Sequence, residues 1–337
     1  MNSSEKIKNF ILNNLTKHEK NIVQVAISKF GVSRQAVHRH MTSLIDQKKI
    51  IAHGYTKGRY YKLIPVVNFN KTIDTKSAGK IHEIPRKFIL PHLKTLKANI
   101  FEIFEFSVGS LINNIFDHAH ASRIYFKIYI NHEKIHFIIS DNGVGIFENI
   151  RSGLNLTDIH LATLELAKGK ITIDPKYHTG DELNTIIHLF DSISIEANGK
   201  SLIHTNHNND WKILKSPMQK GTRIHLEISP ASNRTCAEVF NRIFEIDEKR
   251  ISIPINLLDI ADYRVINSRS QAGNVLRNIQ NFKKIEFDFN QIDLIGPAFA
   301  DELVRKARQK NKSADIKWIN TNKTVDLLLT RALGKHS

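Results

Sequence analysis

The sequence predicts a multidomain protein of mixed α+β and α/β class, with three folded parts in chain order. Its 337 residues and 38.6 kDa exceed what one ordinary hydrophobic core organises. Apolar residues recur at helical spacing in the first part, alternate as in strands in the middle, and follow a regular helix and strand rhythm in the last. We place the parts at residues 1–65, 88–230 and 250–337, with connectors at 66–87 and 231–249.

Composition narrows the class of protein. The chain is 41% hydrophobic and 24% charged, which is typical of a soluble globular protein. No stretch approaches the roughly 18 uninterrupted apolar residues that cross a bilayer, and the opening MNSSEKIKN lacks the apolar core of a secretory signal. We therefore expect a cytoplasmic protein that does not contact a membrane. Cys236 is the only cysteine, which excludes an internal disulfide and a zinc site built from cysteine pairs.

The positive charge is concentrated at the N-terminal end. The formal net charge is +16, and residues 1–65 hold twelve Lys and Arg against Glu5, Glu19 and Asp46, a net +9 from about a fifth of the chain. A basic end of this kind favours a polyanionic partner. A merely solvated basic surface is the alternative.

The first part has the pattern of three helices and a hairpin. Helical spacing predicts helices over 5–15, over 21–31 and, after Ser33 as its cap, over 34–49. The third helix would turn Val37, Met41, Leu44 and Ile45 inward. Two strand-like runs follow around Gly54–Gly58, so the whole is typical of a winged helix-turn-helix.

A winged helix places its third helix in the major groove of double-stranded DNA, and its hairpin along the phosphate backbone. We expect double-stranded DNA as the partner, while a winged helix used only for protein contacts is the alternative. The expected DNA-contacting residues on the helix are Ser33, Arg34, Gln35, His38 and Arg39, and those on the hairpin are Lys57 and Arg59.

The middle part reads as helices on one side of a mostly antiparallel sheet, an α+β sandwich. A long helical stretch over 89–120 precedes the strands RIYFKIYI and KIHFIIS. After a polar segment with some helical character over 147–178, Asn198-Gly199 signals a hairpin within SISIEANGKSLIH, and GTRIHLEIS forms a last strand.

A carboxylate stands at the end of one of these strands. Ile135, Phe137 and Ile139 share a buried face, so Asp141 points the same way and needs a polar partner there. Gly143 follows within DNGVGI, whose two glycines let backbone approach a ligand closely. A carboxylate accepts a hydrogen bond from the exocyclic amine of adenine, whereas guanine presents an oxygen that it repels. The pattern therefore predicts an adenine site.

The helical stretch SLINNIFDHA, residues 110–119, carries polar groups on one face. Ser110, Asn114 and His118 follow at i, i+4 and i+8. The packing face against the sheet comprises Leu111, Ile112, Ile115 and Phe116. An ordinary polar helix face is the alternative explanation.

Together these stretches resemble the GHKL ATP-binding family of DNA gyrase, histidine kinases and anti-sigma kinases, across about residues 88–230. SLINNIFDHA resembles the N box of this family. DNGVGI and HTGDEL resemble its two glycine boxes, and Gly221-Thr222 resembles the start of the strand that lies near the adenine. The resemblance implies a Bergerat α/β sandwich that binds ATP and Mg²⁺, with Asn114 as the metal ligand, Asp141 on the adenine amine and Thr222 supporting Asp141. The implied site residues are Asn114, Asp117, His118, Asp141, Gly143, Gly145, Gly180, Gly221 and Thr222.

Two positions depart from the family pattern. Ser110 stands where ATP-hydrolysing members carry the Glu that activates water, and Glu105 lies on a different part of the helix. Glu182 stands in the phosphate loop where relatives have another glycine. ATP binding without fast turnover is therefore expected. A slow ATPase or a Ser/Thr protein kinase of the anti-sigma type, acting on a separate protein, is the main alternative, and a degenerate ATP fold kept as a scaffold is the second.

The last part resembles a STAS-like domain of unknown function that follows GHKL modules, over about 250–335. Three blocks agree in order: SRSQA (268–272), FDF (287–289) and GPAFADEL (296–303). The resemblance implies a surface for a protein partner; an unrelated small α/β domain is the alternative. The turn at 295–298 has no hydroxyl, which disfavours phosphorelay within the chain.

Other functions are less favoured. No dimerisation helix with a phosphoacceptor His precedes the middle part, which disfavours a sensor kinase. His120 and the run HTNHNND at 204–210 lack convincing metal spacing, so solvated loop histidines are expected there. We expect a DNA-binding transcription regulator in which ATP and Mg²⁺ order residues 147–178 and so reposition the flanking domains.

Overall fold

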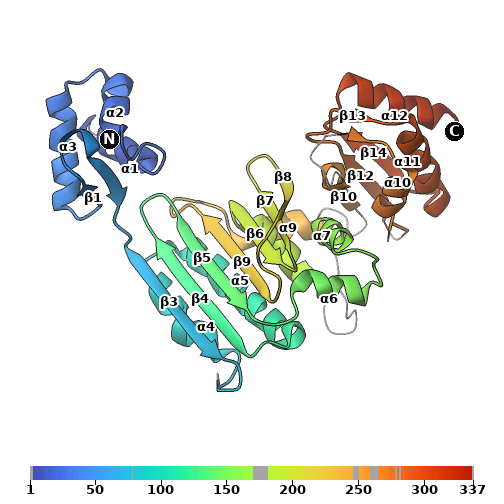
Figure 1. Cartoon of the computed structure of the whole chain (residues 1–337), viewed down its shortest axis with the longest axis horizontal. Coiled ribbons are helices and arrows are strands. Elements are labelled where there is room, and N and C mark those ends of the chain that lie inside the picture. The colour runs from blue at the N-terminus through green and yellow to red at the C-terminus, as the bar shows by residue number, and fades with distance from the viewer. Residues whose placement is uncertain are drawn as a thin grey trace.

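The computed structural model consists of three lobes that follow one another along the chain, with the N- and C-terminal lobes at opposite ends of a central sheet (Figure 1). The structure describes residues 3–77, 79–169, 181–245, 250–258, 265–277, 279–280 and 282–335. Helices and several separate sheets occur together, so the expected mixed multidomain class is confirmed. Among the described residues, no helix has the length and apolar character to cross a membrane.

Three helices and a two-stranded antiparallel sheet make up the N-terminal lobe. They are α1 (Ser3–Asn14), α2 (Ile22–Phe30), α3 (Arg34–Asp46), β1 (Ile50–His53) and β2 (Tyr60–Leu63). The left-handed Gly31 ends α2, and the Ser33 hydroxyl accepts the Ala36 N–H at 3.2 Å to cap α3. The inner face of α3 is the expected one, because Val37 and Met41 are buried.

The N-terminal lobe has a hydrophobic core of its own, separate from the core of the other two lobes. The chain runs from β2 almost directly into the central sheet, and the Thr16 hydroxyl donates to Glu133 at 2.7 Å. The packing of this lobe therefore does not depend on its neighbours.

A seven-stranded, wholly antiparallel sheet forms the centre of the molecule. Its order is β3 (Val67–Asp74), β4 (Arg123–Ile130), β5 (Ile135–Asp141), β9 (Thr222–Ile228), β6 (Ser192–Ala197), β7 (Lys200–Thr205) and β8 (Asp210–Lys215). Burial alternates residue by residue along β5, as a sheet with one covered face requires.

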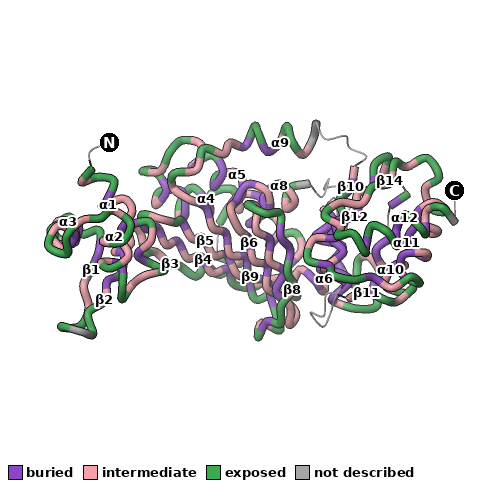
Figure 2. The backbone as a smooth tube through the Cα atoms, turned by 90° about the horizontal axis from the view of Figure 1, so that it is seen from above, coloured by how far each residue is buried: buried purple, intermediate pink, exposed green. Residues whose placement is uncertain are grey.

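Helices cover one face of this sheet, as Figure 2 shows for α4, α5, α8 and α9. Their bounds are α4 (Glu83–Phe88), α5 (Ala98–Asn114), α8 (Asp181–Leu189) and α9 (Cys236–Glu245). Two further helices, α6 (Ile146–Gly153) and α7 (Ile159–Ala167), follow β5. The fully buried Phe104 of α5 packs edge-on against Phe137 of β5 at 6.0 Å between ring centroids, which joins the helix layer to the sheet.

The two segments expected to be connectors have structure. Residues 66–87 contain β3 and α4; β3 looked aperiodic because it is an edge strand in which only Ile73 is buried. Residues 231–249 contain α9, whose Phe240 ring lies 5.1 Å from Phe106 of α5. Both segments belong to the central domain as far as the structure describes them.

The expected long helix over 89–120 is broken. A 3₁₀ turn at Leu90–Leu93 precedes α5, and a π-helical turn at Ile115–Ala119 follows it. The chain then leaves the helix at His120, whose φ of 51° is left-handed. Such π turns widen the helix locally and occur often at functional sites.

The C-terminal lobe has parallel pairing, which confirms its α/β character. Its strands are β10 (Arg250–Pro254), β12 (Lys284–Asp288) and β14 (Asp315–Ile319) in one sheet, with β11 (Val265–Ile266) and β13 (Leu294–Ile295) as a separate pair. Its helices are α10 (Arg269–Val275), α11 (Pro297–Lys310) and α12 (Lys323–Lys335). The Ser-Gln spacing of SRSQA forms a capping box, in which Ser268 and Gln271 each bond the other's backbone.

Helix α7 joins the central and C-terminal lobes, whose buried apolar residues form one continuous core. Every residue from His160 to Ala167 is buried, and α7 contacts both β7 and β10. His160 Nε2 lies 2.7 Å from the Leu257 carbonyl oxygen. The segment expected to be ordered by nucleotide is thus already helical over α6 and α7, while its residues 170–178 lie outside the described part of the chain.

A buried ion pair stands at this junction. Lys168 Nζ lies 2.6 Å from Glu165 Oε1 and 3.5 Å from the Arg277 carbonyl oxygen of the C-terminal lobe, and both side chains are at most 3% exposed. Burial lowers the pKa of Lys168, and the neighbouring carboxylate opposes that shift. The lysine therefore depends on Glu165 for its charge.

We predict that Glu165→Gln destabilises the protein by about 3 kcal/mol or more, because it leaves a buried ammonium without its counter-ion. Urea unfolding followed by the fluorescence of Trp211 and Trp318, which lie in different lobes, measures the change. Glu148→Gln is the matched control, because the Glu148–Arg151 pair has the same i,i+3 spacing but is more than a third exposed. Equal losses for the two variants would contradict the prediction.

Candidate functional site

A buried carboxylate organises the loop that follows β5. Asp141 is 6% exposed, and its Oδ1 accepts the Gly143 N–H at 2.7 Å. Burial raises the pKa of Asp141, and hydrogen bonds from Gly143 and from the backbone and hydroxyl of Thr222 oppose this rise. Thr222 thus lies next to the Asp141 carboxylate in the structure.

Thr222 connects both ends of the loop to the start of β9. It lies next to the Asp141 carboxylate at one end of the loop, and its hydroxyl accepts the Ile146 N–H at 3.0 Å at the other. Gly221, one residue earlier, donates its N–H to the Gly143 carbonyl at 2.8 Å. Two segments about 80 residues apart in the sequence thus form one hydrogen-bonded unit.

The three glycines are required by contacts within the protein. A Cβ on Gly143 would lie 1.9 Å from the Ala119 carbonyl oxygen, and one on Gly221 would lie 2.0 Å from the Asp141 carbonyl oxygen. Gly145 has a φ of 92° and faces the Asn198 side chain. We expected Gly143 and Gly145 to let backbone approach a ligand closely. In the structure Gly143 and Gly221 lie against neighbouring backbone and Gly145 lies against the Asn198 side chain.

Asn198 is a site residue that the sequence revealed only as part of a turn. Its Nδ2 donates to the Val144 carbonyl at 2.9 Å, and its Oδ1 accepts the Glu148 N–H at 3.1 Å. The β6–β7 hairpin turn therefore holds the loop and the start of α6 together. The Asn-Gly pair signalled the turn, but no sequence pattern indicated what its side chain would contact.

The π turn after α5 lies against the same loop. Val144 N–H donates to the Ala119 carbonyl at 3.0 Å, and Asn149 Nδ2 donates to the His118 carbonyl at 2.8 Å. Asn114, where the π turn begins, is half-buried. The structure thus brings the three sequence-predicted segments, 114–119, 141–146 and 221–222, to one place.

Within these segments the side chains differ in exposure. Ser110 is buried, His118 is half-buried and Asp117 is exposed, and the last two make further contacts within the protein. Gly180 of the second glycine box lies outside the described residues. Glu182 is exposed on α8.

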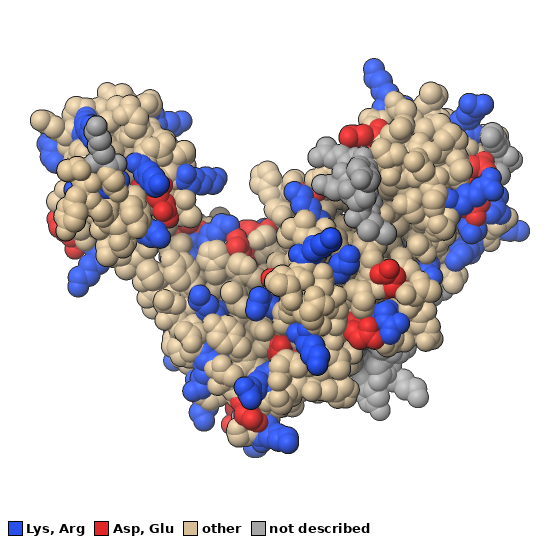
Figure 3. Space-filling model, in the orientation of Figure 1, with Lys and Arg blue, Asp and Glu red and all other residues tan. Residues whose placement is uncertain are grey.

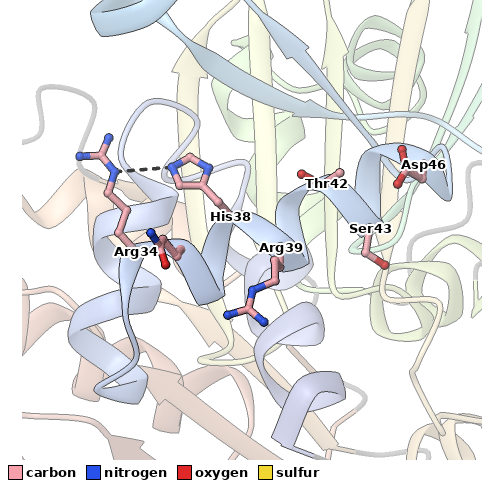
Figure 4. A pocket seen from close by; sticks show the side chains of 7 residues that line it. Arg34, His38, Arg39, Thr42, Ser43 and Asp46 are labelled. Carbon is pink, nitrogen blue, oxygen red and sulfur yellow. Dashed lines mark hydrogen bonds between the residues drawn. The ribbon is translucent and has the colours of Figure 1, made fainter.

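The outer face of α3 forms a second candidate site, a shallow hollow of about 770 Å³ (Figure 4). Arg34, Gln35 and Arg39 are exposed and His38 is half-buried. Arg34 Nε donates to His38 Nε2 at 3.5 Å. The hollow is lined by Arg34, Gln35, His38, Arg39, Thr42, Ser43 and Asp46. The predicted helix residues thus share one accessible surface, next to the cap made by Ser33.

The β1–β2 hairpin carries the remaining predicted residues. Arg59 is exposed, with its guanidinium 5.3 Å from the centre of the Tyr61 ring. Tyr55, in the hairpin turn, is 90% exposed, and no sequence pattern indicated it as a site residue. The Lys57 side chain lies outside the described part of the structure. On the face shown in Figure 3, Lys and Arg are spread over all three lobes, with Asp and Glu among them.

The histidines expected to be solvated divide into two groups. His120 and His207 are exposed, as expected. His204 is fully buried on β7, 4.3 Å from the Trp211 ring between ring centroids, so the expectation was wrong for it. The next strand, β8, was not foreseen, and it is what covers this histidine.

Comparison with known families supports the last lobe. A family model described as "STAS-like domain of unknown function (DUF4325)" matches residues 271–326, the region of α10 to the first turn of α12. The expected STAS-like domain is confirmed over these residues. A comparison with curated proteins gives no match to the chain.

We predict that Gly143→Ala destabilises the protein by about 1–3 kcal/mol, because the added methyl group cannot fit against the Ala119 carbonyl. Gly109→Ala is the matched control, since a Cβ there meets nothing within 4 Å and alanine is the better helix former, by about 0.5–1 kcal/mol. Thermal unfolding followed by circular dichroism measures both. A stabilised Gly143→Ala variant would show that the loop is not held against the π turn.

Proposed function

We propose that the protein is a DNA-binding regulator whose central domain binds ATP with Mg²⁺ as a conformational switch, and whose STAS-like domain is a surface for a protein partner. The observation that carries the proposal is the gathering of segments 114–119, 141–146 and 221–222 around the buried carboxylate of Asp141. These are the segments in which the sequence resembles the GHKL family.

The chemistry of the Asp141 surroundings fits an adenine amine. Asp141 is 6% exposed as a residue, and its carboxylate lies among N–H and O–H groups that favour its ionised form against the effect of burial. An ionised carboxylate offers acceptors only, so it selects a ligand that donates. Adenine donates at this position and guanine does not.

The chemistry of Asn114 fits a magnesium ligand. Its half-buried amide offers one neutral oxygen, and Mg²⁺ is commonly held by few protein oxygens together with phosphates and water. The triphosphate of ATP, bound together with Mg²⁺, would supply a concentrated negative charge, and neighbouring protein segments could become ordered by contacting it. The buried Ser110 hydroxyl, four residues earlier, has no useful basicity at neutral pH, so the proposal is binding rather than rapid hydrolysis.

A chain of contacts offers the path of the switch. The loop after Asp141 runs directly into α6, α6 packs on α7, and α7 is buried against the C-terminal lobe. A ligand that favours one loop geometry would shift α6 and, through it, the C-terminal lobe. A change in the loop after Asp141 would therefore reach the STAS-like domain before the N-terminal lobe.

The N-terminal lobe supplies the DNA contact, as a winged helix. In support, α3 presents Arg34, Gln35 and Arg39 on one exposed face, and the hairpin adds Arg59. The lobe is attached by the short β2–β3 link and not by a shared core. Its orientation can thus change without the loss of buried apolar contacts.

We predict that Asp141→Asn weakens ATP binding by about 10-fold or more, because a hydrogen bond to a charged group contributes about 1.5–3 kcal/mol. Isothermal titration with ATP and Mg²⁺ measures the affinity. Asp288→Asn is the matched control: Asp288 is also a buried Asp at the end of a strand, and it accepts the Asn290 N–H at 2.9 Å. An absence of ATP binding to the unaltered protein would exclude the nucleotide part of the proposal.

We predict that Arg39→Ala weakens DNA binding and reduces the slope of log affinity against log salt by about 1, since one phosphate contact is lost. Electrophoretic mobility shift at several salt concentrations, with and without ATP, measures both effects. Lys317→Ala is the control, because Lys317 is an exposed cation of the C-terminal lobe. DNA binding that is indifferent to ATP would remove the switch and leave the DNA contact standing.

A further inference from the structure

Three metal-ligating side chains meet on the face of the central sheet that the α5 layer does not cover. His136 lies on β5 directly opposite Glu227 on β9, and His225 lies two residues before Glu227 on the same face of β9. Alternation along the strands turns all three outward, since Phe137 and Leu226 point into the core. The side chains of the three are 18–30% exposed, so a solvated ion can reach them.

The ligand atoms are spaced as a zinc ion requires. His136 Nδ1 lies 3.1 Å from His225 Nε2 and 3.3 Å from Glu227 Oε1, and His225 Nε2 lies 3.6 Å from the same oxygen. With zinc–ligand distances of about 2.0–2.2 Å, the edge of a tetrahedron is about 3.3–3.6 Å. The three atoms therefore already form a triangle of the size of one tetrahedral face.

The side chains around the cluster suit a cation. The Glu227 carboxylate stands beside two imidazole nitrogens, so one acidic group is available to offset the charge of a bound cation. Lys134 is bound to the other oxygen of Glu227 and leaves Oε1 facing the histidines. The other charged groups nearby are Glu196 and Arg223, which pair with each other.

We propose that His136, His225 and Glu227 bind Zn²⁺, with water at the fourth position on the solvent side. Two imidazoles and one carboxylate are a common three-ligand set for zinc, whereas Mg²⁺ and Ca²⁺ prefer oxygen ligands throughout. Occupation would join β5 to β9 by a bridge across the strand pair. The site does not rest on the nucleotide proposal, because its residues are distinct from those around Asp141.

Isothermal titration of the full-length, tag-free protein with Zn²⁺, after treatment with chelator, tests the site. One zinc per chain is expected, and Co²⁺ is expected to give the visible absorption of a tetrahedral complex. We expect zinc binding to weaken by about 100-fold or more in each of His136→Ala, His225→Ala and Glu227→Gln. Loss of a side chain that only hydrogen-bonds a metal ligand already costs about 10–100-fold in affinity, so loss of a ligand itself should cost at least as much. His132→Ala, in the turn beside the site, is the control and should bind as the unaltered protein does.

Lys134→Ala gives a test that removes none of the three proposed zinc ligands. Removal of this ammonium, which lies against Glu227, should strengthen zinc binding by about fivefold, as expected for one nearby like charge in a water-exposed setting. Circular dichroism checks that each variant is folded. Three results would overturn the proposal. They are zinc binding that survives the loss of both histidines, an octahedral Co²⁺ spectrum, and no uptake of Zn²⁺ by the unaltered protein.

Discussion

The hydrogen bonding of one buried carboxylate holds the loop after β5 in its observed form. Ionised Asp141 is costly to bury, and Gly143 and Thr222 offset that cost only if the loop closes tightly and β9 begins next to the end of β5. Tight closure leaves no space for a Cβ at residue 143 or 221. It also brings the loop against the π turn at Ala119, so the end of α5, the loop and the start of β9 become mutually dependent.

The lobes differ in how strongly they are joined, and this sets which motions are energetically accessible. Helix α7 is buried on all sides, and separation of the central and C-terminal lobes would expose it together with the Glu165–Lys168 pair. The N-terminal lobe keeps its own core and is tied by a short link and the Thr16–Glu133 bond. Changes at the Asp141 loop can thus be transmitted to the C-terminal lobe through rigid contact, whereas reorientation of the N-terminal lobe is limited mainly by its link.

The sequence predicted what local patterns determine and missed what tertiary contacts determine. Strands β4, β5 and β9 alternate strictly, and Asn198-Gly199 supplies the two positive φ angles that the hairpin turn needs, so these elements were predictable. Strand β3 was not predictable, because an edge strand needs little apolar surface. Some helical character was expected over 147–178, but the burial of α7 on every side was not, because it depends on the packing of two lobes around the helix. The pairing of Asp141 with Thr222 followed from a family resemblance, while the role of Asn198 and the meeting of His136 with Glu227 depend on loop closure and strand register.

The β5–β9 pair carries its two candidate sites on opposite faces and at opposite ends. Asp141 and Thr222 stand on the helix-covered face where β5 ends and β9 begins, and the histidine cluster stands on the open face at the other end. One register between the two strands sets both geometries, since a slip of one residue would turn every one of these side chains to the wrong face. A zinc ion on the open face would therefore favour the same register that places Thr222 next to Asp141. By thermodynamic linkage, a ligand that stabilises this register at one site also favours ligand binding at the other site. The two sites are coupled in this way although they share no side chain.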